Sequence, residues 1–156
     1  MFHKLQFGNR NTRIIDYIYN AFDKDKNGQI DFTEAVISLS ILRNGDLIQM
    51  LKLIFDVYDL NGDGKINEKE IKQIIKSLYD AINIPKKSRR GINSPRYRAK
   101  ESIKLFDKNG DRLIDVNEFI EGFFQNSNFS SQIYIYFNYL AENFIDFNIF
   151  PSLITF

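Results

Sequence analysis

The chain has 156 residues, a formal net charge of +1 and no cysteine, so disulfides and thiolate chemistry are excluded. Hydrophobic residues make up 44% of the chain and aromatic residues 15%, which suits the core of one or two small domains. The single histidine, His3, excludes a histidine-based triad and a zinc site with several histidines. No apolar run reaches the ~18–20 residues of a membrane span.

The first residues, MFHKLQFGNRN, lack the apolar run of a secretory signal. The second residue is Phe2 rather than the glycine that acylation requires, so we expect no N-myristoylation on this chain. We therefore expect a cytoplasmic protein.

Three 12-residue segments share one pattern of oxygen-bearing side chains. Loop 1 (residues 23–34) reads DKDKNGQIDFTE, loop 2 (59–70) reads DLNGDGKINEKE, and loop 3 (107–118) reads DKNGDRLIDVNE. The first two loops fit the calcium-loop template D-x-[DN]-x-[DN]-G-x5-E, and the third departs from it only at Arg112, which stands where the template has glycine. Polar turns between core helices would also be acidic, but three complete copies make that reading improbable.

Calcium requires six to eight hard oxygen ligands, which the loop supplies from positions 1, 3 and 5, the carbonyl of position 7 and both oxygens of the glutamate at position 12. The predicted ligands are Asp23, Asp25, Asn27, the Gln29 carbonyl and Glu34 in loop 1; Asp59, Asn61, Asp63, the Lys65 carbonyl and Glu70 in loop 2; and Asp107, Asn109, Asp111, the Leu113 carbonyl and Glu118 in loop 3. Position 9 (Asp31, Asn67, Asp115) can act through water and can cap the following helix.

Apolar residues recur at three- and four-residue spacing on both sides of the loops, which predicts helices there. Ser94-Pro95 predicts the start of the helix before loop 3. Position 8 is isoleucine each time (Ile30, Ile66, Ile114), a β-branched residue suited to a short strand between two loops. The expected fold is all-α, built of helix-loop-helix repeats with short inter-loop β-pairing.

These segments resemble a known family. YNAFDKDKNGQIDFTEAVISLS and LKLIFDVYDLNGDGKINEKEIKQIIKSLY are similar to the second and third EF-hands of neuronal calcium sensors, the recoverin, frequenin and visinin-like group, and AKESIKLFDKNGDRLIDVNEFIEGF resembles the fourth. The loop starts are 36 and then 48 residues apart, which is also similar to this family. The resemblance implies Ca²⁺ as the cofactor and a target protein bound through an apolar groove.

The chain begins about where the family's first hand ends, so we expect that hand to be missing. The expected domains are residues 1–45 as an unpaired N-terminal EF-hand, 46–128 as paired EF-hands with a basic linker at 85–100, and 129–156 as an aromatic-rich tail. An unpaired hand could be covered by a second copy of the chain, by a target or by the tail.

The linker PKKSRRGINSPRYRAK holds seven basic residues and no acidic ones. It could contact an anionic membrane surface or an acidic partner, or be a solvated loop. We do not favour nucleic acid as a partner, because Tyr97 is the only aromatic residue interleaved with these charges.

The function expected first is a calcium sensor that exposes an apolar groove and regulates a target protein. The alternatives are a calcium buffer and a regulatory subunit similar to calcineurin B. We do not expect an enzyme, because the carboxylates are committed to metal geometry. We expect up to three Ca²⁺ ions, with loop 3 weaker because Arg112 must adopt a bend that glycine makes freely.

Overall fold

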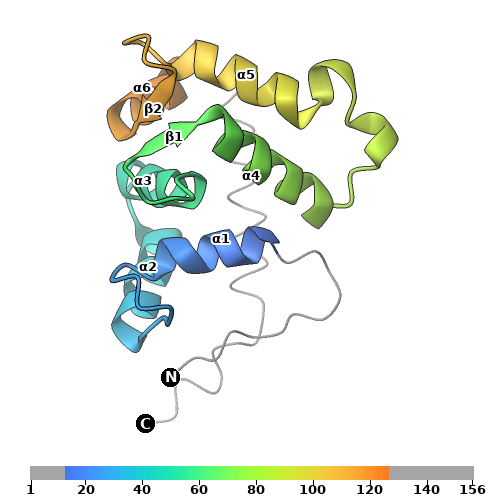
Figure 1. Ribbon diagram of the computed structural model, residues 1–156. Coiled ribbons are helices and arrows are strands. Elements are labelled where there is room, and N and C mark those ends of the chain that lie inside the picture. Colours follow the sequence, from blue (N-terminus) through green and yellow to red (C-terminus); the bar gives the residue numbers. More distant parts are fainter. Residues whose placement is uncertain (1–12, 127–156) are drawn as a thin grey trace. The chain divides into compact units, whose positions relative to one another are not determined.

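The computed structural model describes residues 13–126 (Figure 1). The chain divides into two compact units, Met1–Gly122 and Phe123–Phe156. The tail predicted at 129–156 lies outside the described residues. Among the residues that are described, no helix combines the length and apolar character needed to cross a membrane.

The described part of the chain is mostly helical. Its elements are α1 (Arg13–Phe22), α2 (Phe32–Asn44), α3 (Leu47–Tyr58), β1 (Lys65–Asn67), α4 (Glu68–Ala81), the 3-10 turns η1 (Lys86–Ser88) and η2 (Gly91–Asn93), α5 (Pro95–Phe106), β2 (Leu113–Asp115) and α6 (Val116–Gln125). Each loop lies between two helices, so the predicted fold class is confirmed.

Local capping explains where the helices begin. Asp31 caps α2 and Asn67 caps α4, and in each case the glutamate three residues later accepts a hydrogen bond from the backbone N–H of the cap residue. Ser94 caps α5 by accepting a hydrogen bond from the Tyr97 N–H, with Pro95 at the first helical position. The capping roles predicted for these residues are confirmed.

Loops 2 and 3 are joined by the antiparallel strands β1 and β2, in which Ile66 lies opposite Ile114. Both isoleucines are almost fully buried. Within residues 13–126, loop 1 has no such strand, and the Ile30 N–H instead donates to the Tyr19 hydroxyl at 3.2 Å. The predicted pairing is therefore confirmed for two of the three loops.

The core of the first unit joins all the hands. The Phe119 ring lies 5.8 Å from that of Phe55 and 6.0 Å from that of Phe106, which is fully buried. Helices α4 and α5 pack against each other (Figure 1), and α1 contacts both α3 and α4. The buried residues Ile14 and Ile18 of α1 therefore belong to a helix that is in contact with the second hand.

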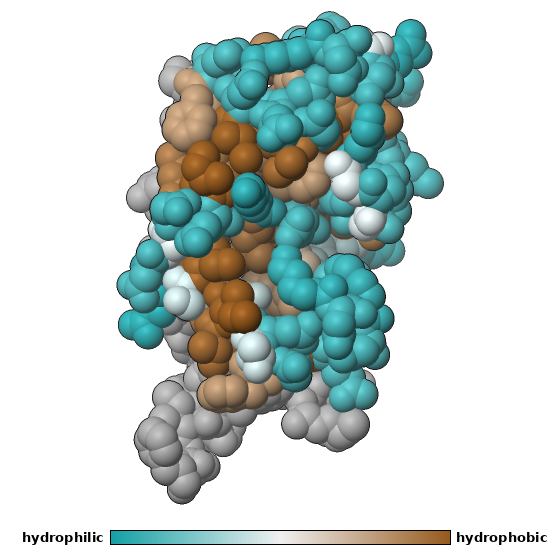
Figure 2. All heavy atoms as spheres, turned by 90° about the vertical axis from the view of Figure 1, so that its left-hand side faces the viewer, coloured by the Kyte–Doolittle hydropathy of each residue, from teal (hydrophilic) through white to brown (hydrophobic). Residues whose placement is uncertain are grey.

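Helix α2 differs from α1 because much of its apolar surface is exposed. Phe32 is 64% exposed, Val36 47% and Ile37 52%, and the neighbouring start of α3 exposes Leu47 and Ile48. Figure 2 shows apolar side chains gathered in a band on the face that carries α2 and α3. We call these five residues the apolar face.

The basic linker is not uniformly exposed. The guanidinium of Arg89 forms an ion pair with Asp80, donates to the carbonyls of Tyr79 and Ile84, and lies 5.7 Å from the centre of the Tyr79 ring. Arg89 therefore ties the linker to the end of α4, and this part of the basic segment is structural.

We predict that Arg89→Gln lowers the free energy of unfolding by about 1.5–3 kcal/mol, because hydrogen bonds to charged groups contribute on that order when one partner is removed. Denaturant unfolding measures the change. Arg90→Gln is the matched control, since Arg90 is exposed and a surface change there should alter stability by less than about 0.5 kcal/mol. Equal stability of the two variants would contradict the anchoring role.

Candidate metal centre

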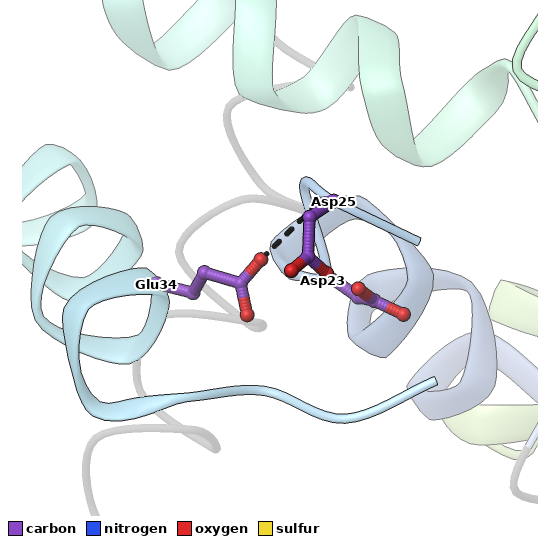
Figure 3. A group of neighbouring side chains, drawn as sticks. All are labelled: Asp23, Asp25 and Glu34. Carbon is purple, nitrogen blue, oxygen red and sulfur yellow. Dashed lines mark hydrogen bonds between the residues drawn. The ribbon is translucent and has the colours of Figure 1, made fainter. Parts of the chain in front are cut away.

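Loop 1 brings three predicted ligands together. Carboxylate oxygens of Asp23, Asp25 and Glu34 all lie within 4.8 Å of one another. Figure 3 shows Asp23 and Asp25 in the loop after α1, with Glu34 reaching toward them from the start of α2. Two oxygens bound to one Ca²⁺ lie at most about 5 Å apart at the usual bond lengths, so this spacing fits that ion.

The first aspartate of every loop holds the bend at position 6. The backbone N–H of Gly28 donates to Asp23 at 2.8 Å, and Gly64 does the same to Asp59 at 2.8 Å. The N–H of Arg112 donates to Asp107 at 2.9 Å. Loop 3 therefore keeps the backbone contact that glycine makes in the other two loops.

The side chains at positions 3 and 5 are also held by the backbone in the same way in all loops. The position-5 oxygens of Asn27, Asp63 and Asp111 accept from the N–H of Gln29, Lys65 and Leu113 at 2.8, 2.9 and 2.8 Å. The position-3 oxygens of Asp25, Asn61 and Asn109 accept from the N–H two residues later. Positions 3 and 5 therefore have the same backbone contacts in all three loops.

The glutamate at position 12 spans its loop from end to end. One oxygen of Glu118 accepts from the Lys108 N–H at 3.0 Å and the other from the Asp115 N–H at 3.0 Å. Glu34 does the same with Lys24 at 2.8 Å and Asp31 at 3.0 Å. Glu70 likewise accepts from the N–H of residues on both sides of its loop, Asn61 and Asn67.

The pKa values of Glu34 and Glu70 shift in opposite directions. Hydrogen bonds from backbone N–H groups, that of Asp31 first, hold the pKa of Glu34 below its usual range. Burial raises the pKa of Glu70, although the N–H groups of Asn67 and Asn61 oppose the shift. A cation bound in loop 2 would therefore offset the cost of burying the Glu70 carboxylate. The Glu34 carboxylate is instead stabilised as an anion by backbone N–H groups.

Among the described residues, loops 2 and 3 do not form a comparable group of three clustered carboxylates. Each loop has one amide among its side-chain donors, at position 3 in loops 2 and 3 (Asn61, Asn109) and at position 5 in loop 1 (Asn27). The donor set in all three loops is nevertheless carboxylate, amide and carbonyl oxygen, which suits a hard cation such as Ca²⁺. The assignment of individual ligand residues stays a prediction.

Sequence reasoning missed a second strained position. Arg112 has a left-handed backbone, with φ 64°, as expected for position 6. Lys26, at position 4 of loop 1, is also left-handed, with φ 57°, where loops 2 and 3 have Gly62 and Gly110 at φ 71° and 81°. The absence of glycine at this position was the available signal. Loops 1 and 3 each hold one strained residue, and loop 2 holds none at these two positions.

Two family comparisons agree with this geometry. Residues 48–124 match the EF-hand domain pair, and residues 20–34 match the EF hand. Guanylyl cyclase-activating protein 2 of Lithobates pipiens is 35% identical over 114 residues, which cover 69% of this chain and 56% of that protein. Guanylyl cyclase-activating protein 2 of Gallus gallus is 31% identical over 124 residues, covering 78% of this chain and 63% of that protein. The chain thus spans less than two thirds of either relative's length.

We predict that Arg112→Gly tightens Ca²⁺ binding at loop 3 by about 5- to 30-fold, because a residue with a Cβ loses roughly 1–2 kcal/mol in the left-handed region. Lys26→Gly should act similarly at loop 1. Calorimetric titration gives the number of sites and their affinities.

The reverse change provides the control. Gly64→Ala places a Cβ at φ 81° with no neighbouring atom within 4 Å, so it tests backbone strain without a steric clash. It should weaken loop 2. An unchanged affinity of loop 3 in Arg112→Gly would show that the bend tolerates arginine.

Proposed function

The chain is an EF-hand protein of the neuronal calcium sensor family, and we propose that it is a calcium-dependent regulator of a target protein. The target class we propose is a guanylyl cyclase, because the relatives are named for activating that enzyme. The role is regulatory rather than catalytic.

The observation that carries this proposal is that α2 holds both a predicted ligand and three of the five residues of the apolar face. Glu34 lies in the first turn of α2, and the exposed side chains of Phe32, Val36 and Ile37 belong to the same helix. A shift of Glu34 toward Asp23 and Asp25 would therefore reorient α2 and, with it, the apolar side chains that a partner can contact.

Bound Ca²⁺ would supply the positive charge that offsets repulsion among the loop carboxylates. The residues themselves transmit the change: Glu34 is fixed to the α2 backbone through the reciprocal cap with Asp31, so the carboxylate and the helix start move as one. Sensor EF-hands differ from buffer EF-hands because their helices change angle in this way when Ca²⁺ binds.

A calcium buffer needs the same loops without this movement, so a Ca²⁺-dependent change in the exposure of the apolar face separates the two functions. Homodimerisation through the first hand has less support, because α1 contacts α3 and α4. The apolar face on α2 and α3 better supports a target protein as the partner.

We also propose peripheral contact with an anionic membrane through the exposed part of the basic linker. Arg89 is excluded from this surface by its contacts, but Lys86, Lys87, Arg90, Arg96 and Lys100 are exposed. Two apolar or aromatic residues lie between these basic residues in the sequence: Ile92 is 66% exposed and Tyr97 is 44% exposed. Apolar and aromatic side chains flanked by cations suit the headgroup region of an anionic bilayer.

The sensor function predicts that Ca²⁺ changes both the fluorescence of an apolar dye bound to the chain and the rate of a membrane guanylyl cyclase to which the chain is added. The variant with Glu34→Gln, Glu70→Gln and Glu118→Gln should lose both responses. Val36→Asn with Ile37→Asn should lose cyclase regulation while still binding Ca²⁺, and Ser40→Asn, an exposed site on the same helix, is the matched control. Calcium binding without any dye response would favour the buffer.

The membrane proposal predicts sedimentation with vesicles containing phosphatidylserine but not with pure phosphatidylcholine. Lys86→Glu with Arg90→Glu should weaken this binding about tenfold or more, since each basic residue near the surface contributes about 1 kcal/mol. Lys72→Glu with Lys76→Glu changes the same charge on exposed residues of α4 and should have a smaller effect. Equal losses would show that only net charge matters.

A further inference from the structure

A lysine of loop 2 reaches across to a predicted calcium ligand of loop 3. The strand register places Lys65 opposite Asp115, so its side chain lies beside the neighbouring loop. The Lys65 Nζ lies 2.7 Å from Oδ2 of Asp111, and Oδ1 of the same aspartate accepts from the Leu113 N–H at 2.8 Å. Both oxygens of Asp111 therefore have donors.

This contact has no counterpart in the opposite direction. The residue of loop 3 that corresponds to Lys65 is Leu113, which carries no charge. The carboxylate of loop 2 that corresponds to Asp111 is Asp63, whose Oδ2 accepts from the neutral amide of Asn61 at 2.9 Å. The inter-loop cation therefore acts on loop 3 alone.

The side chains of three other loop lysines contact groups outside the predicted ligand sets. Lys24 bonds to Asp56, Lys26 to the carbonyl of Asn20, and Lys108 to Glu121. Lys65 differs because the group it contacts is itself a predicted ligand.

We propose that Lys65 is an affinity-setting residue that competes with Ca²⁺ for Asp111 and makes loop 3 fill after loop 2, an inference that rests on the proposed calcium-binding function. The Lys65 side chain is 43% exposed and that of Asp111 35%, so solvent and salt screen the pair and its effect is moderate.

Lys65 also links the two sites through its backbone. Its carbonyl is the predicted position-7 ligand of loop 2, and its N–H donates to Asp63 at 2.9 Å. One residue therefore serves loop 2 with its backbone and restrains loop 3 with its side chain. Release of the side chain when loop 3 fills leaves the backbone role intact.

The test is a calorimetric Ca²⁺ titration of the full chain and of Lys65→Gln. We expect the weakest site to tighten about two- to fivefold in Lys65→Gln, the range given by exposed ion pairs. Lys108→Gln is the matched control, because it removes a cation next to the same loop that contacts Glu121 instead of a ligand. It should change the affinity less than twofold.

A second pair of variants assigns the effect to loop 3. In a Glu118→Gln background, which disables that loop, Lys65→Gln should leave the remaining affinities unchanged. Circular dichroism of each variant confirms that the fold is kept.

The outcomes separate this inference from the proposed function. If the chain binds Ca²⁺ and Lys65→Gln matches the unsubstituted chain, or Lys108→Gln has an equal effect, the role of Lys65 is overturned and calcium sensing stands. If the unsubstituted chain binds no Ca²⁺, both are overturned.

Discussion

The glutamate that ends each loop is the contact on which the rest of the hand depends. Its two carboxylate oxygens accept backbone N–H groups from both sides of the loop, as Glu118 does with Lys108 and Asp115. The same side chain lies in the first turn of the helix that follows. A single carboxylate therefore fixes the start of that helix relative to the end of the preceding helix. A cation bound to this carboxylate acts on both helices.

The surroundings of this glutamate differ between the hands. Glu70 and Glu118 are buried, and their loops are joined by the β1–β2 pair. In the described part of loop 1 no strand partner is present, and the Ile30 N–H uses the Tyr19 hydroxyl instead. Loops 2 and 3 are thus built to act on each other, whereas Glu34 acts on α2 and its apolar face.

Local features were predictable because they depend on residues close in sequence. The loop patterns, the caps at Asp31 and Asn67 and the start of α5 at Ser94 all follow from spacings of a few residues. The pairing of Ile66 with Ile114 was expected from the isoleucine that each loop repeats at position 8. The grouping of Asp23, Asp25 and Glu34 follows from the same 12-residue pattern.

Features that depend on tertiary contacts were not predictable. Helical spacing placed Phe32 and Val36 on an apolar stripe but could not say that no helix within residues 13–126 covers them. A run of basic residues does not indicate which one turns inward, and the contacts of Arg89 with Asp80 and the Ile84 carbonyl required the fold. The pair of Lys65 and Asp111, 46 residues apart, depends on the strand register.

Among the described residues, one ion pair links loop 1 to helix α3 of the second hand and another links loop 2 to loop 3, and the two differ in what calcium binding does to them. Lys24, at position 2 of loop 1, pairs with Asp56 of α3, and neither residue belongs to the predicted ligands. This pair can persist in any calcium state, although its exposure makes its contribution to stability small. Lys65 pairs with a predicted ligand, so that pair must weaken when loop 3 fills. The first hand therefore keeps its tie to the second, while the link between loops 2 and 3 is the one that calcium changes.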